Sequence, residues 1–163
     1  MALNALVDAA APGAWLAAAI AAAAAILHAW RLAGWQGWRA RREPILWSLH
    51  LAYAWLPVGF AMKAAWLATS WSGGSFWLHA LAAGAIAGMV LAVATRVALG
   101  HTGRPLQVST PVAWAYALLS LSVITRVALP HAGLLDYDGC LVVAALLWSA
   151  AFLIFVGAYA PIL

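Results

Sequence analysis

The chain has 163 residues, of which 67% are hydrophobic and only 7% are charged, with a formal net charge of +4. A soluble domain carries about 25% charged residues, so this composition excludes a soluble fold and indicates an integral membrane protein. The basic excess does not indicate nucleic-acid binding, because the arginines lie at segment ends and in one loop, where they orient a membrane protein and meet lipid phosphates. With four acidic residues and no hydrolase triad, phosphate loop or dinucleotide fingerprint, hydrolytic and phosphoryl-transfer functions are also excluded.

Five apolar segments are long enough to cross a lipid bilayer, since a crossing needs about 20 residues. The predicted helices cover residues 14–33, 45–69, 76–99, 111–129 and 139–160. We therefore expect an all-α polytopic transmembrane bundle that forms a single domain over residues 1–163.

The third segment carries small residues at intervals of four. These residues are Ala80, Gly84, Gly88 and Ala92, and such a ridge lets a neighbouring backbone come close. We expect this segment to be central in the bundle and the most buried of the five.

The basic residues are distributed unevenly between the two predicted faces of the membrane. One side has Arg31, Arg39, Arg41, Arg42, Arg96 and Arg104, and the other has Lys63 and Arg126. Because cytoplasmic loops carry the excess of arginine and lysine, we expect the N-terminus outside and the C-terminus in the cytoplasm.

Five histidines sort by predicted depth into two groups. His28 and His50 each lie about 8 Å from the cytoplasmic end of their helices, at 1.5 Å per residue, and His101 ends the third segment on that face. Two histidines on facing helices at one depth suit a b-type haem, and His28 with His50 is the best such pair. Tyr53 lies one turn from His50 on the same helix face.

Two arginines on the cytoplasmic side have two interpretations. Arg96 and Arg104 either reach lipid phosphates or bind the propionates of a haem, because a guanidinium pairs with a carboxylate through two hydrogen bonds. Lys63 lies deeper and either reaches the outer interface or serves a polar cavity.

Softer metal ligands gather on the predicted outer side. They are His79, His131, Cys140 and Met62, and imidazole, thiolate and thioether are ligands that suit copper. Methionine is usually a packing residue, and a single histidine within a helix often only joins two helices by a hydrogen bond. The alternative to a haem protein is therefore a non-enzymatic transport or sensor component whose histidines and arginines line a polar path or serve packing.

Several stretches resemble the NnrS family. They are residues 44–55, 79–89, 95–105 and 159–163, and the Gly-His-Thr-Gly-Arg-Pro run at 100–105 is the most specific. Members are multi-pass proteins of the bacterial inner membrane, described as containing haem and copper and linked to denitrification and the nitric-oxide response. The resemblance implies a haem protein that relieves nitrosative stress, and it places His50, His79 and His101 at family motif positions.

The resemblance also concerns chain length. Family members are about twice as long, and this chain resembles their C-terminal half. A metal site shared between halves would then need a homodimer or a partner that supplies the N-terminal half. The resemblance does not fix a substrate, an electron donor or a catalysed reaction.

Overall fold

The computed structural model describes residue 6 and residues 15–163, and among these residues it contains helices and turns but no β-strand. The longer helices are α2 (Trp15–Gly34), α3 (Pro44–Thr69), α5 (Ala87–His101), α6 (Thr110–Val127) and α8 (Tyr137–Tyr159). Shorter ones are η1 (Gly37–Ala40), η2 (Ser72–Phe76), α4 (Trp77–His79), the π-helix η3 (Ala80–Ile86), α7 (Leu129–Ala132) and η4 (Ala160–Ile162). Five helical stretches in the described part are long and apolar enough to cross a membrane, so the predicted all-α membrane architecture is confirmed.

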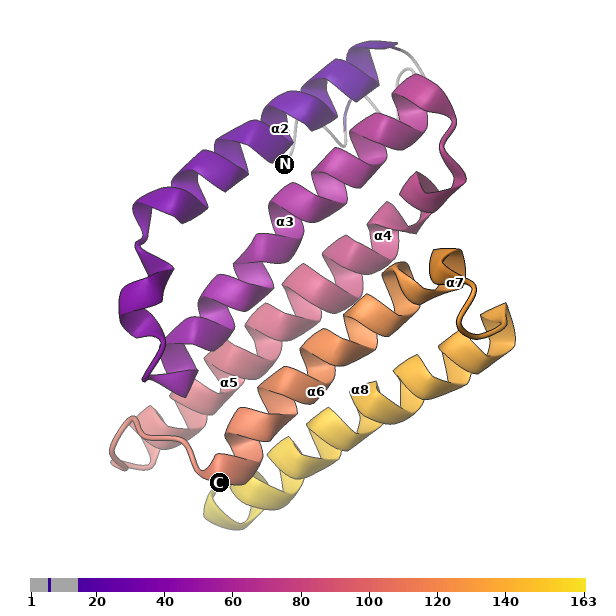
Figure 1. Cartoon of the computed structure of the whole chain (residues 1–163). Coiled ribbons are helices and arrows are strands. Elements are labelled where there is room, and N and C mark those ends of the chain that lie inside the picture. The colour runs from indigo at the N-terminus through magenta and orange to yellow at the C-terminus, as the bar shows by residue number, and fades with distance from the viewer. Residues whose placement is uncertain (1–5, 7–14) are drawn as a thin grey trace.

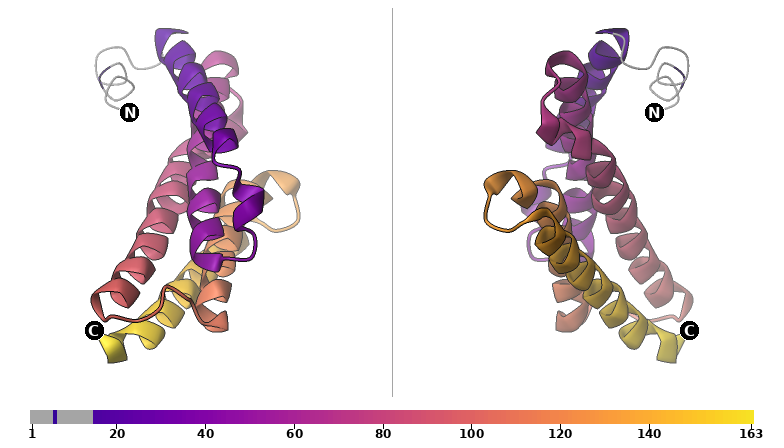
Figure 2. Two further views of the ribbon diagram at one scale, coloured as in Figure 1. Left: turned by 90° about the vertical axis from the view of Figure 1, so that its left-hand side faces the viewer. Right: turned by 90° about the vertical axis from the view of Figure 1, so that its right-hand side faces the viewer.

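The helices form an open row (Figure 1). At one edge α2 packs on α3, at the other edge α8 packs on α6, and the third segment, α4–η3–α5, lies between α3 and α6. The side views show that the segments cross at an angle and that α7 projects at one end (Figure 2). The edge helices expose large apolar side chains such as Trp30 and Leu146, as a protein surrounded by lipid acyl chains does.

The small-residue ridge brings the third segment against α3. A Cβ atom built on Gly84 would collide with the ring of Trp55, and one on Gly88 would lie 2.8 Å from the Cβ of Ala52. Only glycine permits these approaches, so the predicted close packing of this ridge is confirmed. The ridge crosses from the π-helix η3 into α5, and one-turn π segments often accompany functional sites.

The third segment is central in the row, but the prediction that it is the most buried is wrong. In its apolar window 28% of residues are buried, against 44% for α6. The reason is geometric: α6 packs along α8 and also contacts α3, η3 and α5, so neighbouring helices cover more of its residues.

Candidate cofactor site

His50 lies two turns into α3 and is held by its own helix. Its Nδ1 is 2.8 Å from the carbonyl oxygen of Leu46. Since a carbonyl only accepts hydrogen bonds, Nδ1 carries the proton and Nε2 holds the free lone pair of the neutral ring. That Nε2 atom is buried and has no hydrogen-bond partner. A ring fixed through Nδ1 whose Nε2 has no hydrogen-bond partner is the arrangement typical of a metal-ligating histidine.

An apolar groove adjoins this imidazole. It has a volume of about 460 Å³ and is lined by Leu32, Ala33, Gly37, Trp38, Trp47, His50 and Leu51. Pockets for cofactors and drug-sized ligands measure roughly 300–1,000 Å³ and are mostly apolar. The groove therefore has the size and chemistry for a large apolar ligand.

Gly37 in η1 allows the backbone to approach the His50 ring. A Cβ at Gly37 would lie 2.7 Å from Cδ2 of His50, so no larger residue fits without a shift. Gln36, just before η1, has a left-handed backbone with φ of 50°, and this turn folds η1 over the imidazole. The ring of Trp35 also meets that of His50 edge-on, with 5.7 Å between centroids.

A second, basic hollow lies next to the groove. It measures about 350 Å³ and is lined by Trp38, Arg39, Arg41 and Arg42. Trp38 lines both hollows. The arginine-rich loop between α2 and α3 thus adjoins the apolar groove that contains His50.

His28 and Tyr53 form a separate contact between α2 and α3. Nδ1 of His28 lies 2.7 Å from the Tyr53 hydroxyl, and the His28 ring stacks on Phe60 with 5.8 Å between centroids. Tyr53 contacts Trp35 at 4.4 Å, which in turn contacts His50. The two histidines predicted to face each other across a haem are therefore connected through the rings of Tyr53 and Trp35.

His79 and His131 lie together at the other end of the row. The guanidinium of Arg126 donates to Nε2 of His79 at 3.2 Å and packs over Phe76 at 5.3 Å. The ring of His131 meets Phe76 edge-on at 5.1 Å. The lone pair of His79 is already used by the arginine, so this nitrogen is not available to a metal in the observed arrangement.

The proposed copper ligands do not form a site here. Among residues 15–163, no group of three His, Cys, Asp or Glu side chains could hold a metal ion. Cys140 is fully buried, with Sγ 3.9 Å from the Leu135 carbonyl, and Met62 packs against the apolar cluster of Ala80, Val123 and Val127. These residues do not fit a copper centre, and no chemistry through copper is derived from them.

The Gly-His-Thr-Gly-Arg-Pro run at residues 100–105 ends helix α5. Gly103 has φ of 68°, the Arg104 amide donates to Leu99 at 3.0 Å and the Gly103 amide to Gly100 at 3.3 Å. These two bonds are the Schellman motif, in which a left-handed glycine closes a helix. His101, Arg96 and Arg104 are exposed, and none of them lines the groove at His50.

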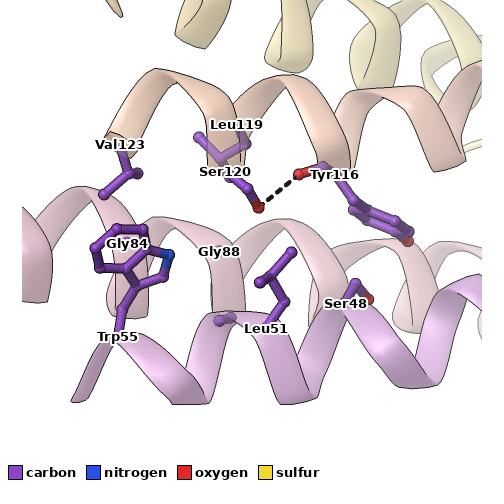
Figure 3. Close-up of a pocket in the computed structure, with 10 residues that line it drawn as sticks. Ser48, Leu51, Trp55, Gly84, Gly88, Tyr116, Leu119, Ser120 and Val123 are labelled. Atoms are coloured by element: carbon purple, nitrogen blue, oxygen red, sulfur yellow. Dashed lines mark hydrogen bonds between the residues drawn. The ribbon is translucent and has the colours of Figure 1, made fainter. Parts of the chain in front are cut away.

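A small internal cavity lies between α3, the third segment and α6 (Figure 3). Its free volume of about 10 Å³ is enough for roughly one water molecule. Three side chains that carry a hydroxyl line it, Ser48, Tyr116 and Ser120, and Ser120 donates to the Tyr116 carbonyl at 2.9 Å. A large cofactor does not fit here, whereas the groove at His50 has both the volume and a histidine in its lining.

The sequence analysis left two alternatives for Lys63, the outer interface and a polar cavity. It did not place the residues of the loop between α2 and α3 at the candidate site. Lys63 is 2% exposed and its Nζ lies 4.8 Å from the Trp77 ring centre, so it does not extend to the surface. Trp38 and the arginines after it line the hollows beside His50 although they precede it by about ten residues. The signal was present in the run of aromatic and basic residues directly before the start of α3.

The fold and this groove define a polytopic helical membrane protein with a candidate cofactor site where α2, η1 and α3 meet. The chain belongs to the NnrS family: the family described as NnrS protein matches residues 1–163. The match includes the first helix, which lies outside the stretches that carry the sequence resemblance. No curated protein and no solved structure shows significant similarity.

Proposed function

We propose that this protein binds haem in a bacterial inner membrane, with His50 as an axial ligand, and that it acts in the nitric-oxide response. One observation carries the proposal: the buried Nε2 of His50 has no partner, while Nδ1 is fixed on the Leu46 carbonyl. A buried polar atom without a hydrogen bond is costly, and coordination to iron would satisfy it.

The surrounding residues fit this group. Trp38, Trp47 and Leu51 supply an apolar surface for a macrocycle beside the imidazole. The Leu46 carbonyl fixes the tautomer and orientation of His50, and this raises the basicity of the ligating nitrogen. Bound haem would supply an iron that takes a small gas as a further ligand, with the polarity of the pocket deciding the outcome.

The link to nitric oxide comes from the family. The NnrS resemblance implies a role in relieving nitrosative stress, and haem iron is a suitable ligand-binding centre for that gas. The proposal does not specify an electron donor or a catalysed reaction.

The alternative, in which the histidines serve only packing, accounts for part of the molecule. His28 bonds to Tyr53 and His79 to Arg126, and both contacts join two helices. The packing alternative does not account for His50, because its Nε2 has no hydrogen-bond partner.

The test is an optical spectrum of the detergent-purified chain expressed with ample haem. We expect a Soret band in the wild type and its loss or shift in His50→Ala. His131→Ala, a histidine outside the groove, is the control and should keep the wild-type spectrum. An unchanged spectrum in His50→Ala would contradict the ligand assignment, and a wild-type chain that binds no haem would contradict the function.

A further inference from the structure

We propose that the loop between α2 and α3 is the subsite for the acidic groups of the bound molecule, with Arg39, Arg41 and Arg42 binding its carboxylates. This inference rests on the proposed function. It specifies the ligand as an amphiphile that has a flat apolar body and negatively charged side groups at one edge.

The first argument is the junction of the two hollows. The apolar groove contains the His50 imidazole, the basic hollow is lined by the three arginines, and Trp38 lines both. A ligand that lies over Trp38 in the groove therefore has its edge beside the guanidinium groups. Neither hollow alone would select a molecule that is both apolar and acidic.

The second argument is charge. The basic hollow has three guanidinium groups and no carboxylate among its lining residues; Glu43, the next residue along the chain, is exposed. Guanidinium groups form paired, charge-assisted hydrogen bonds with carboxylates, which are stronger than neutral ones. The excess of positive charge thus favours a ligand that has more than one acidic group.

The third argument concerns the arginines that the sequence had suggested for this role. Arg96 and Arg104 belong to α5 and the turn after it, whereas the residues that line the groove belong to α2, η1 and α3. The loop arginines replace them as the candidates. Arg31 provides a comparison, because it lies near the groove but packs over Trp35 at 5.8 Å and lines neither hollow.

The experiment compares two probes that differ only in their acidic groups. Haem and haem dimethyl ester, in which both propionates are neutral, are titrated into the full chain in detergent and followed in the Soret region. The triple variant Arg39→Gln, Arg41→Gln, Arg42→Gln should bind haem about tenfold more weakly or worse and bind the ester as the wild type does. Arg31→Gln and Arg104→Gln are matched single-charge controls and should bind both probes normally.

Each other outcome overturns the inference. Equal losses for both probes would mean that the arginines only maintain the loop, and no loss would mean that they do not touch the ligand. A selective loss in Arg104→Gln would move the subsite to the turn after α5. A further outcome is that the triple variant binds haem normally but no longer prefers nanodiscs of phosphatidylglycerol over those of phosphatidylcholine. In that case the loop arginines bind lipid headgroups and not the ligand. A wild type that binds neither probe overturns the proposed function as well, whereas a wild type that binds both equally overturns the subsite alone.

Discussion

Arg126 and His79 are joined by a hydrogen bond of 3.2 Å between the guanidinium Nη2 and the imidazole Nε2. The same Nη2 lies 2.9 Å from the Tyr137 hydroxyl. Because arginine only donates, His79 accepts through Nε2 and is neutral in this arrangement. The bond connects α4 to α6, so His79 has a structural role in the described fold.

Replacing His79 should therefore lower the stability of the fold and leave haem binding unchanged. In His79→Ala the guanidinium loses one of its partners at a partly buried position, which should lower the free energy of unfolding by about 1–3 kcal/mol. Thermal unfolding in detergent measures the first effect and the Soret spectrum the second. Loss of the Soret band in a variant that still folds would assign the haem to His79 instead.

The close approach of the third segment to α3 predicts a contrast between two glycines. Gly84→Ala places a methyl group against the Trp55 ring and should destabilise the fold by about 1–3 kcal/mol, as overpacking does. Gly100→Ala has no atom within 4 Å of the new Cβ and should be neutral or slightly stabilising, because alanine favours a helix. Equal unfolding temperatures for the two variants would contradict the packing described here.

Much of the fold could be predicted from the sequence because lipid leaves few alternatives. Backbone groups in a bilayer must be satisfied within the segment, so an apolar stretch such as residues 139–160 has to be a helix. The ends observed at Tyr137 and Tyr159 lie within two residues of that range. The ridge at Gly84 and Gly88 was predictable for the same reason, since close helix packing in a membrane needs small residues.

The site was only partly predictable. The position of His50 in the second helix could be predicted from the sequence, but the rotation of α2 against α3, which places Tyr53 and Trp35 between His28 and His50, depends on side-chain packing. The position of Trp38 depends on the left-handed turn at Gln36, a conformation uncommon for a residue other than glycine. Likewise, the hydrogen bond between Arg126 and His79 depends on a contact across 47 positions of the chain.

The tight approach of η1 to the imidazole makes Gly37 a test of the groove. In Gly37→Ala the new methyl group meets Cδ2 of His50 at 2.7 Å, so either the ring leaves the Leu46 carbonyl or η1 moves away. We expect weaker haem binding in a titration, by about 1–3 kcal/mol if the strain is carried into the complex. Gly34→Ala, whose new Cβ has open space, is the matched control and should bind as the wild type does.

The orientation expected from the arginine distribution predicts which loops are accessible from each side of the membrane. Ser109 and Ser72 are exposed and lie at opposite ends of the third segment. With a membrane-impermeant maleimide, Ser72→Cys should label in intact cells and Ser109→Cys only after the membrane is opened, as the arginine distribution requires. The native Cys140 is fully buried and should contribute little background, and Cys140→Ala removes it. The reverse pattern would invert the topology.

The last prediction concerns the pair formed by His28 and Tyr53. Their 2.7 Å hydrogen bond joins α2, an edge helix, to α3, and Tyr53 is 7% exposed, so loss of either group leaves a partner without its bond. Tyr53→Phe and His28→Ala should each lower the free energy of unfolding by about 1–2 kcal/mol. The double variant should lower the free energy of unfolding by less than the sum of the two single changes, because both remove the same bond.

If His28 served instead as a second axial ligand, His28→Ala would shift the Soret band while Tyr53→Phe would leave it in place. We expect both variants to keep the wild-type spectrum, because the His28 ring is stacked on Phe60 and His28 does not line the groove that contains His50.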